Sequence, residues 1–291
     1  MRNLNAPGFR IAFAKRQRLP PDAIPTHLPA LNSLMHDDGG QIGFGRGWFV
    51  TLAGLTGHGK SVTALNFCVA ALKAGESVAY VSLEMSAQQI AARYYAIAGS
   101  VPIIGLERGS FSEQVWANAE LGTTELPALW VPDTISGRWE DLVAFIREAV
   151  EERGATMVIV DYLQLASTGN EDNIMRAITE VTTDLRVYAA NRGVTALVLS
   201  QFNRQTTSEF RVRPRVSGLW GGAIIEQSSD VVLLLGHHAF ERDEKSGLAR
   251  TWLLVEKNRH GTVGDVPILY NFKDLTQRQA LPDELADWPD P

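Results

Sequence analysis

The sequence predicts an α/β fold in which helices flank both faces of a mainly parallel, twisted β-sheet. From Trp48 onward, short apolar runs alternate with amphipathic stretches, as they do when buried parallel strands are connected by helices. A glycine-rich turn at residues 54–59 joins the first apolar run to the first amphipathic stretch. With 291 residues and 45% apolar content, the chain is long enough to bury the core of one such domain.

Six apolar runs are predicted to be strands, because each is short, rich in Val, Ile and Leu, and bounded by polar or turn-forming residues. In chain order, the predicted strands are Trp48–Ala53, Val78–Leu83, Leu129–Pro132, Met157–Val160, Ala196–Ser200 and Val231–Leu235.

Four helices are predicted between these strands, beginning near Gly59, Ser86, Gly137 and Asp172. The second opens with Ser-Ala-Gln-Gln, which has the spacing of a capping box. In the fourth, apolar residues recur every three or four positions, as one face of a helix requires. These residues are Ile174, Ile178, Val181, Leu185 and Tyr188.

The end of the chain has a different pattern. Two β-rich runs, Arg250–Glu256 and Val266–Asn271, predict an antiparallel hairpin with a charged tip at residues 257–264. We expect one core domain at residues 24–280, followed by an acidic tail at 281–291. The basic arm at residues 1–23 is either a solvated tail or a segment that docks on a partner or a neighbouring subunit.

The composition narrows the function classes. With 27 basic and 33 acidic residues, the net charge is −6, so any contact with nucleic acid must come from a local basic patch. The single cysteine, Cys68, cannot form an internal disulfide. Neither a signal peptide nor a run of about 18 apolar residues is present, so the expected location is the cytoplasm.

Residues 54–61, Gly-Leu-Thr-Gly-His-Gly-Lys-Ser, match the phosphate-binding P-loop motif and lie between a predicted strand and a predicted helix. Backbone N–H groups at this turn would bind the phosphates of ATP. Lys60 would neutralise the β- and γ-phosphates, while the Ser61 hydroxyl would bind Mg²⁺. The alternative is a glycine-rich turn that binds no ligand. The predicted nucleotide-binding residues are Gly54, Thr56, Gly57, His58, Gly59, Lys60 and Ser61.

Three polar residues follow other predicted strands and should reach the same cleft, because parallel strands present their carboxyl ends to the ligand. Asp161 is expected to join Ser61 at Mg²⁺. Glu84 is the candidate that activates water, and Gln201 could contact both the γ-phosphate and a moving part of the protein. Each of the three could instead be an ordinary turn, cap or strand-end residue.

Taken in order, these motifs resemble the RecA-like motor domain of DnaB-type hexameric replicative helicases, from about residue 24 to 279. The Tyr-Leu-Gln-Leu run that follows Asp161 is more specific than the P-loop. The matching stretches are Ile24–Thr26, Leu28–Asn32, the P-loop, Ser82–Met85, Val160–Leu165, Ser200–Arg204, Ile225–Gln227 and Lys257–Arg259.

The resemblance implies roles for several residues. Glu84 would be the catalytic base and Gln201 would sense the nucleotide state. Lys257 and Arg259 would reach into the ATP site of a neighbouring subunit, where an arginine supplied in trans stabilises the transition state. Residues between 203 and 227 would line a central channel and contact DNA. The candidates for this contact are Arg204, Arg211, Arg213, Arg215 and Trp220.

Three departures from the family pattern stand out. Such helicases usually carry an N-terminal scaffold domain and a linker helix, whereas only the arm precedes Ile24 in this sequence. Trp220 stands near a position where a basic residue is usual, and could stack on a base or anchor the core. His27 and His58 are also unusual, and we expect them to be polar loop residues without a catalytic role.

The leading hypothesis is an ATP-dependent DNA helicase of the DnaB type that acts in DNA replication. It would use ATP and Mg²⁺, move on single-stranded DNA and form a homo-oligomer, expected to be a hexamer. A replication loader or primase would be its partner. The alternative is a RecA-like recombination or branched-DNA ATPase without processive unwinding. A P-loop kinase is a weaker third reading, because the sequence offers no acceptor pocket or lid.

Overall fold

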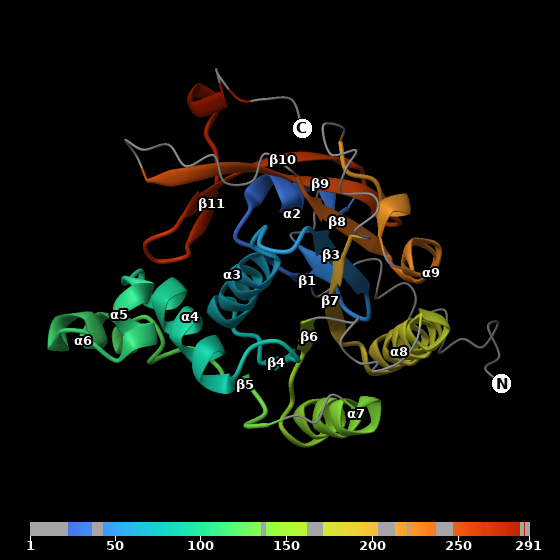
Figure 1. The fold of residues 1–291 in the computed structure, drawn as a ribbon, viewed down its shortest axis with the longest axis horizontal. Coiled ribbons are helices and arrows are strands. Elements are labelled where there is room, and N and C mark those ends of the chain that lie inside the picture. The colour runs from blue at the N-terminus through green and yellow to red at the C-terminus, as the bar shows by residue number, and fades with distance from the viewer. Residues whose placement is uncertain are drawn as a thin grey trace, which may run out of the picture.

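A large sheet forms the centre of the computed structural model, which describes residues 23–36, 43–134, 138–161, 171–202, 213–219, 221–236, 247–285 and 288. Within these residues the sheet has nine strands in the order β11-β10-β9-β8-β3-β7-β6-β4-β5. The strands from β8 to β5 run parallel to one another, and β9, β10 and β11 continue the sheet in antiparallel fashion (Figure 1). The predicted α/β class with a C-terminal antiparallel hairpin is therefore confirmed.

The six predicted strands are present, with ends that differ from the prediction by at most two residues. They are β3 (Phe49–Gly54), β4 (Val78–Ser82), β5 (Leu129–Trp130), β6 (Met157–Asp161), β7 (Thr195–Gln201) and β8 (Val231–Leu235). The hairpin consists of β9 (Leu248–Asn258) and β10 (Gly264–Asn271), and β11 (Gln277–Gln279) adds an edge strand that the sequence did not indicate. A separate small pair is formed by β1 (Ala23–Ile24) and β2 (Phe44–Gly45).

The four predicted helices are α3 (Lys60–Lys73), α4 (Ala87–Gly99), α7 (Trp139–Arg147) and α8 (Glu171–Arg192). The capping box of α4 is present, because the Ser86 hydroxyl accepts from the Gln89 N–H and the Gln89 side chain accepts from the Ser86 N–H. The described residues contain four further α-helices that were not predicted, namely α2 (Pro29–Leu34), α5 (Ile103–Arg108), α6 (Glu113–Leu121) and α9 (Gly222–Ser228).

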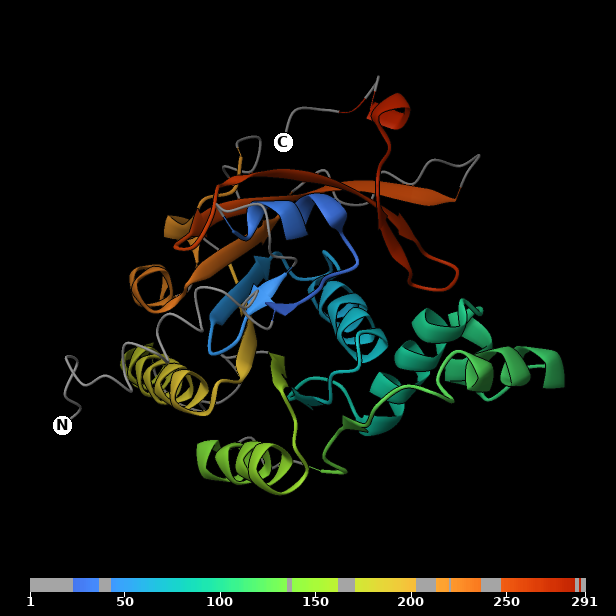
Figure 2. The same cartoon turned by 180° about the vertical axis from the view of Figure 1, so that it is seen from behind.

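Helices cover both faces of the sheet (Figures 1 and 2). Residues that alternate along each strand point to opposite faces. One set, including Leu52 and Ile159, packs with α3 residues such as Leu65 and the buried Cys68. The other set, including Val198, packs against α7 and α8. Within the described residues, no helix is both long enough and apolar enough to span a membrane.

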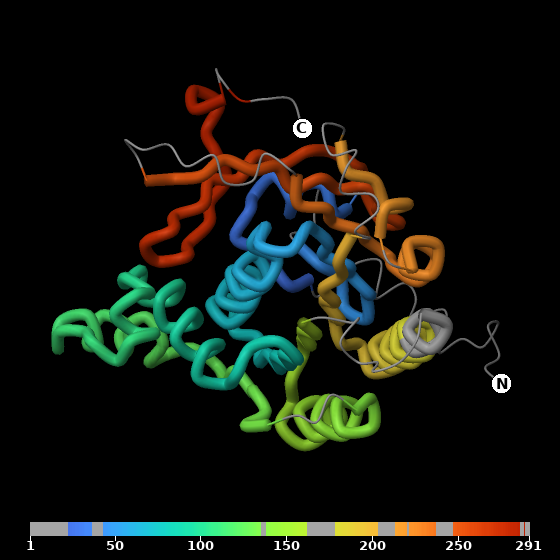
Figure 3. The backbone as a smooth tube through the Cα atoms, viewed as in Figure 1, coloured from blue at the N-terminus to red at the C-terminus, as the bar shows by residue number. Residues whose placement is uncertain are grey.

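The helices α4, α5 and α6 form a group at one side of the molecule, beside α3, as the backbone trace shows (Figure 3). Aromatic rings hold this group together, because Trp116 of α6 packs on Tyr95 of α4 at 5.3 Å and on Phe111 at 5.5 Å. Loops follow the C-terminal ends of the parallel strands.

Candidate functional site

The predicted site residues lie together at the C-terminal ends of the parallel strands. We call this end of the sheet the carboxyl edge. Gly54 at the end of β3 is paired in register with Gln201 at the end of β7. Asp161 at the end of β6 is paired with Ser82, two residues before Glu84. The four adjacent strands β3, β7, β6 and β4 therefore all end at this edge, as expected for a parallel α/β fold.

The turn between β3 and α3 has the backbone shape of a phosphate cradle. Gly57 and Gly59 have φ angles of 81° and 76°, a left-handed conformation that favours glycine. Gly59 is the N-cap of α3, and no side chain caps this helix start. Oxygens of a phosphate could therefore accept hydrogen bonds from N–H groups of the first turn, where the helix dipole also favours negative charge. Thr56 and Gly57 are exposed, while His58 and Gly59 are half-buried.

Lys60 lies in this cradle with its ammonium group folded against the protein. Its side chain is 7% exposed, and Nζ donates a hydrogen bond of 2.9 Å to the Leu55 carbonyl. A Cβ on Gly54 would lie 3.3 Å from Cγ of Lys60, so the glycine leaves room for this side chain. Burial lowers the pKa of Lys60 to about 8, although the negative charges of Asp161 and Glu84 oppose the shift.

Asp161 is the buried anion of the site, with 1% exposure. The Tyr80 hydroxyl donates a 2.9 Å hydrogen bond to Oδ2. Oδ1 is also buried but has no hydrogen bond of ordinary length from the described residues. Burial raises the pKa of Asp161, whereas the neighbouring Ser61 and Tyr80 hydroxyls lower it. A buried carboxylate oxygen without a hydrogen bond of ordinary length from the described residues, together with the neighbouring Ser61 hydroxyl, is a donor set that fits Mg²⁺.

Tyr80 is a site residue that the sequence reasoning missed. It is fully buried on β4, and its ring belongs to the main core while its hydroxyl reaches Asp161. The only signal in the sequence is a tyrosine within an otherwise aliphatic strand, and a buried tyrosine hydroxyl requires a polar partner. Burial and the Asp161 charge both raise the pKa of Tyr80, so it stays a neutral hydrogen-bond donor.

Glu84 and Gln201 flank this centre. Glu84 is exposed at the turn after β4, where its N–H and that of Met85 donate to the Ser82 hydroxyl at 3.2 and 2.8 Å. Its carboxylate is close enough to shift the pKa values of both Lys60 and Asp161. Gln201 is half-buried beside the start of the P-loop.

His27 lies in a loop, as expected, but it is half-buried and its ring packs on the core. Both of its ring nitrogens are buried, and the ring packs on Phe67 of α3 with centroids 5.2 Å apart. The reason is local, because Thr26 and Asn32 hydrogen-bond each other and fold this segment onto the core. Burial lowers the pKa of His27 to about 3, an effect that the nearby Gln277 side chain opposes.

His58 is half-buried in the P-loop. Burial lowers its pKa, the backbone of Gly236 at the end of β8 raises it, and the charge of Lys60 lowers it.

The predicted finger residues are Lys257 and Arg259. They lie at the N-terminal ends of the parallel strands, which we call the amino edge. Asn258 between them is paired with Val231, the first residue of β8. The strand β9 continues to Asn258, so Lys257 belongs to the strand, and the loop is shorter than predicted, spanning residues 259–263. Since the six residues of the neighbouring β3 span about 20 Å, these cations cannot reach the P-loop of their own chain.

Main-chain carbonyls at the end of α9 hold the two cations. The Lys257 ammonium donates to the Glu226 carbonyl. The Arg259 guanidinium donates to the Gln227 carbonyl at 2.6 Å and pairs with Asp230 at 3.2 Å. Burial and the charge of Arg259 lower the pKa of Lys257, while nearby acids raise it. Positive groups at the C-terminal end of a helix are favourable, because the carbonyls there carry partial negative charge.

Only two of the predicted DNA-contacting residues lie within the described structure, because Arg204, Arg211 and Trp220 fall outside it. Arg213 makes a bidentate ion pair with Asp265 at 2.5 and 2.6 Å and a further contact with Glu256 at 3.3 Å. These partners raise the pKa of Arg213.

Arg215 is more accessible, with 65% exposure of its side chain, although it also contacts Glu256 at 3.3 Å. The basic patch expected from the sequence is therefore partly neutralised by the hairpin within the same chain.

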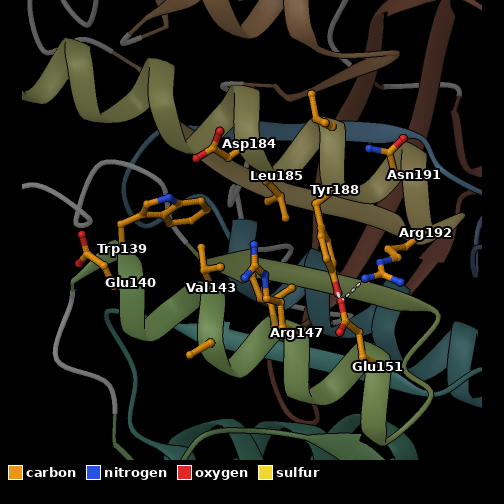
Figure 4. A pocket seen from close by; sticks show the side chains of 13 residues that line it. Trp139, Glu140, Val143, Arg147, Glu151, Asp184, Leu185, Tyr188, Asn191 and Arg192 are labelled. Carbon is orange, nitrogen blue, oxygen red and sulfur yellow. Dashed lines mark hydrogen bonds and ion pairs between the residues drawn. The ribbon is translucent and has the colours of Figure 1, made fainter. Parts of the chain in front are cut away.

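A pocket of about 1120 Å³ lies elsewhere, between α7 and α8 (Figure 4). Trp139 and Leu185 contribute apolar surface, and Glu151 accepts hydrogen bonds from Tyr188 at 3.2 Å and from Arg192 at 2.6 Å. None of the predicted nucleotide-site residues lines it. The pocket is thus separate from the P-loop chemistry.

Comparison with protein families agrees with this arrangement. The model of the DnaB-like helicase C-terminal domain matches residues 24–278. The replicative DNA helicase DnaB of Geobacillus stearothermophilus is 29% identical over 233 residues, which cover 78% of this chain and 51% of that protein. A probable plasmid replicative DNA helicase of Chlamydia psittaci is 32% identical over 231 residues, which cover 78% and 50%. The chain thus spans about half the length of these relatives.

Solved structures show the same fold. The ATPase domain of G40P superposes with a TM-score of 0.78 at 20% identity, covering 94% of this chain and 98% of that domain. A DnaB-like replicative helicase, solved in a study of its interactions with primase, also gives 0.78 at 20% identity, covering 95% of this chain and 68% of that one. With its RecA-like fold, its P-loop and a family match over residues 24–278, the chain belongs to the DnaB-like helicase C-terminal domain family.

Proposed function

We propose that this chain is the ATP-hydrolysing motor of a DnaB-type replicative DNA helicase, which moves on single-stranded DNA in the cytoplasm. The observation that carries the proposal is the separation of two half-sites. Lys60, Ser61 and Asp161 lie at one edge of the sheet, and Lys257 and Arg259 lie at the other. A complete site then needs two chains packed head to tail, which generates a ring when the rotation closes.

At the P-loop edge, Lys60 and the backbone of residues 54–61 would hold the phosphates of ATP. Ser61 and Asp161 would hold Mg²⁺, which neutralises charge on the phosphate oxygens when bound. Glu84, exposed at the rim, would accept a proton from the attacking water. Nucleotide binding would also release Lys60 from the Leu55 carbonyl.

At the other edge, Arg259 and Lys257 would complete the site of the next subunit by stabilising the negative charge of the transition state. Their distance from their own P-loop supports action in trans. We propose a hexamer as the assembly, by analogy with the DnaB-type family, with a replication loader or primase as a further partner.

Gln201 would connect nucleotide and DNA. It ends β7 next to Gly54, and the following residue, Phe202, forms a bridge with Leu219 inside the segment proposed to contact DNA. Of the candidate contacts, Arg204, Arg211, Arg215 and Trp220 remain the proposed DNA ligands. Arg213 would have to give up its pairing with Asp265 and Glu256, so an internal role for it is favoured.

The test is an ATPase assay with and without single-stranded DNA, together with strand displacement from a forked duplex. We expect DNA to stimulate hydrolysis and the fork to be unwound. Electron microscopy with an ATP analogue and single-stranded DNA should show six-membered rings. Filaments together with stimulated ATPase but no displacement would instead favour the recombination-type alternative, and absence of both activities would contradict the proposal.

A further inference from the structure

Asp230, at the junction between α9 and β8, joins the finger to the strand that leads to the P-loop. Its Oδ2 accepts a 2.9 Å hydrogen bond from the N–H of Phe49, the first residue of β3. Its Oδ1 lies 3.2 Å from Nη1 of Arg259 and 3.9 Å from Nε2 of His260. The side chain is only 14% exposed, so solvent screens these interactions incompletely.

The backbone of the finger loop is already held by other contacts. The His260 ring stacks on Trp48 with centroids 4.1 Å apart and an interplanar angle of 10°. The Thr262 N–H donates to the Leu34 carbonyl at 3.0 Å, and the Asn258 amide donates to the same carbonyl at 2.7 Å. What these contacts leave open is the direction of the long Arg259 side chain.

Two acceptors determine that direction. The Gln227 carbonyl binds Nη2 of Arg259, and Asp230 binds Nη1, so the planar guanidinium is held at two points. A charged group that is oriented before reaction stabilises a transition state without a cost of reorganisation at that moment. An arginine that is free to adopt several rotamers would instead lose side-chain conformational entropy each time it bound the transition state.

We propose that Asp230 is a positioning residue for the composite ATP site, which aims Arg259 at the neighbouring subunit. This inference rests on the proposed action of Arg259 in trans. Asp230 would not touch ATP itself. The competing explanation is that Asp230 only fixes the start of β3 and thereby supports the P-loop of its own chain.

The substitution Asp230→Asn separates these explanations, because an amide oxygen can still accept from the Phe49 N–H while the negative charge facing Arg259 is lost. We expect kcat for DNA-stimulated ATP hydrolysis to fall roughly tenfold, with KM for ATP changed less than about twofold. In an Arg259→Ala background the same change should have little further effect, because its target is absent. Glu284→Gln, which removes the ion pair with Arg278, is the matched control and should leave kcat unchanged.

Mixed assemblies give the decisive measurement. In a mixture of Asp230→Asn and Lys60→Ala chains, some interfaces combine the intact P-loop of the first variant with the correctly aimed finger of the second. ATPase activity should then exceed the average of the two separate preparations. The mixture of Arg259→Ala and Lys60→Ala is run beside it and reports on the finger alone.

The outcomes are distinct. If the mixture with Arg259→Ala gains no activity, the action in trans fails, and the proposed composite site with it. If that mixture gains activity while the mixture with Asp230→Asn stays at the average, Asp230 acts on its own P-loop and the positioning role is overturned. Wild-type kcat in Asp230→Asn would also overturn it. Should this variant not fold, Asp230→Glu enters the same mixing test, with a smaller loss and the same gain expected.

Discussion

The two edges of the parallel sheet differ in how completely their charged groups are satisfied. At the carboxyl edge, Asp161 is buried with one oxygen that lacks a hydrogen bond of ordinary length from the described residues, and Lys60 is folded onto a loop carbonyl. At the amino edge, Lys257 and Arg259 are bound by the last carbonyls of α9 and by Asp230.

Under the proposed function, this difference would let one chain carry both halves of an ATP site without closing it. In the proposed function, the carboxyl edge receives phosphates and a cation, and the burial of Lys60 and Asp161 with incomplete pairing supports this role. At the amino edge, the Arg259 guanidinium is held by two acceptors while its side chain is 37% exposed. About 20 Å of β3 separates the two, so only a second copy can bring them together.

The largest effect is expected from the amino edge. Arg259→Ala should lower kcat for ATP hydrolysis by about three orders of magnitude, because the finger acts on the charge of the transition state. Nucleotide affinity, measured by fluorescence titration, should change little. Arg278→Ala, which removes an exposed arginine from the adjacent β11, provides the control. An unchanged kcat in the Arg259 variant would contradict a role of the amino edge in ATP hydrolysis.

A somewhat smaller effect is expected from the carboxyl edge. Glu84→Gln should lower hydrolysis by about two orders of magnitude, because it removes a general base, while ATP binding is retained. Lys60→Ala should instead weaken binding itself. Binding measurements and single-turnover hydrolysis on both variants distinguish the two roles. Equal turnover in Glu84→Gln would exclude this carboxylate from the chemistry.

A third prediction concerns the docking of the N-terminal segment on the P-loop helix. His27 has a folded-state pKa of about 3 and a usual value of 6.5, so the unfolded chain binds more protons between these values. Stability should therefore fall as the pH drops through this window, by roughly 2 kcal/mol between pH 7 and pH 5 from His27 alone. For His27→Gln, urea unfolding should show a loss in the free energy of unfolding between pH 7 and pH 5 that is smaller by this amount. An identical loss in both proteins would contradict the burial of the His27 ring.

The smallest expected effect is proton uptake by Lys60 of the P-loop when ATP binds. Because the pKa of Lys60 is about 8 and bound phosphates favour its charged form, ATP binding at pH 8 should take up roughly half a proton. Affinity should decline as the pH rises above 8. Calorimetry in two buffers of different ionisation enthalpy measures the uptake, and Lys60→Arg, whose charge does not titrate there, should abolish it.

Several parts of the fold could be predicted because they depend on residues that are neighbours along the chain. Apolar runs set the six parallel strands, the Ser86–Gln89 capping box began α4, and the P-loop glycines marked the strand-to-helix turn. These signals are local, because periodicity, capping and left-handed turns depend on a few consecutive side chains. The helices α5 and α6 were missed because they are short and much of their surface is exposed.

The tertiary structure alone decided the contacts between residues that are distant in sequence. Tyr80 meets Asp161 across 81 positions, and Asp230 meets Phe49 across 181. Arg213, expected to be free for DNA, is paired with Asp265 across 52 positions. Strand order and register create these neighbours, and neither can be deduced from one strand at a time. The P-loop could thus be recognised from eight residues, whereas the distance that makes it half a site required the whole sheet.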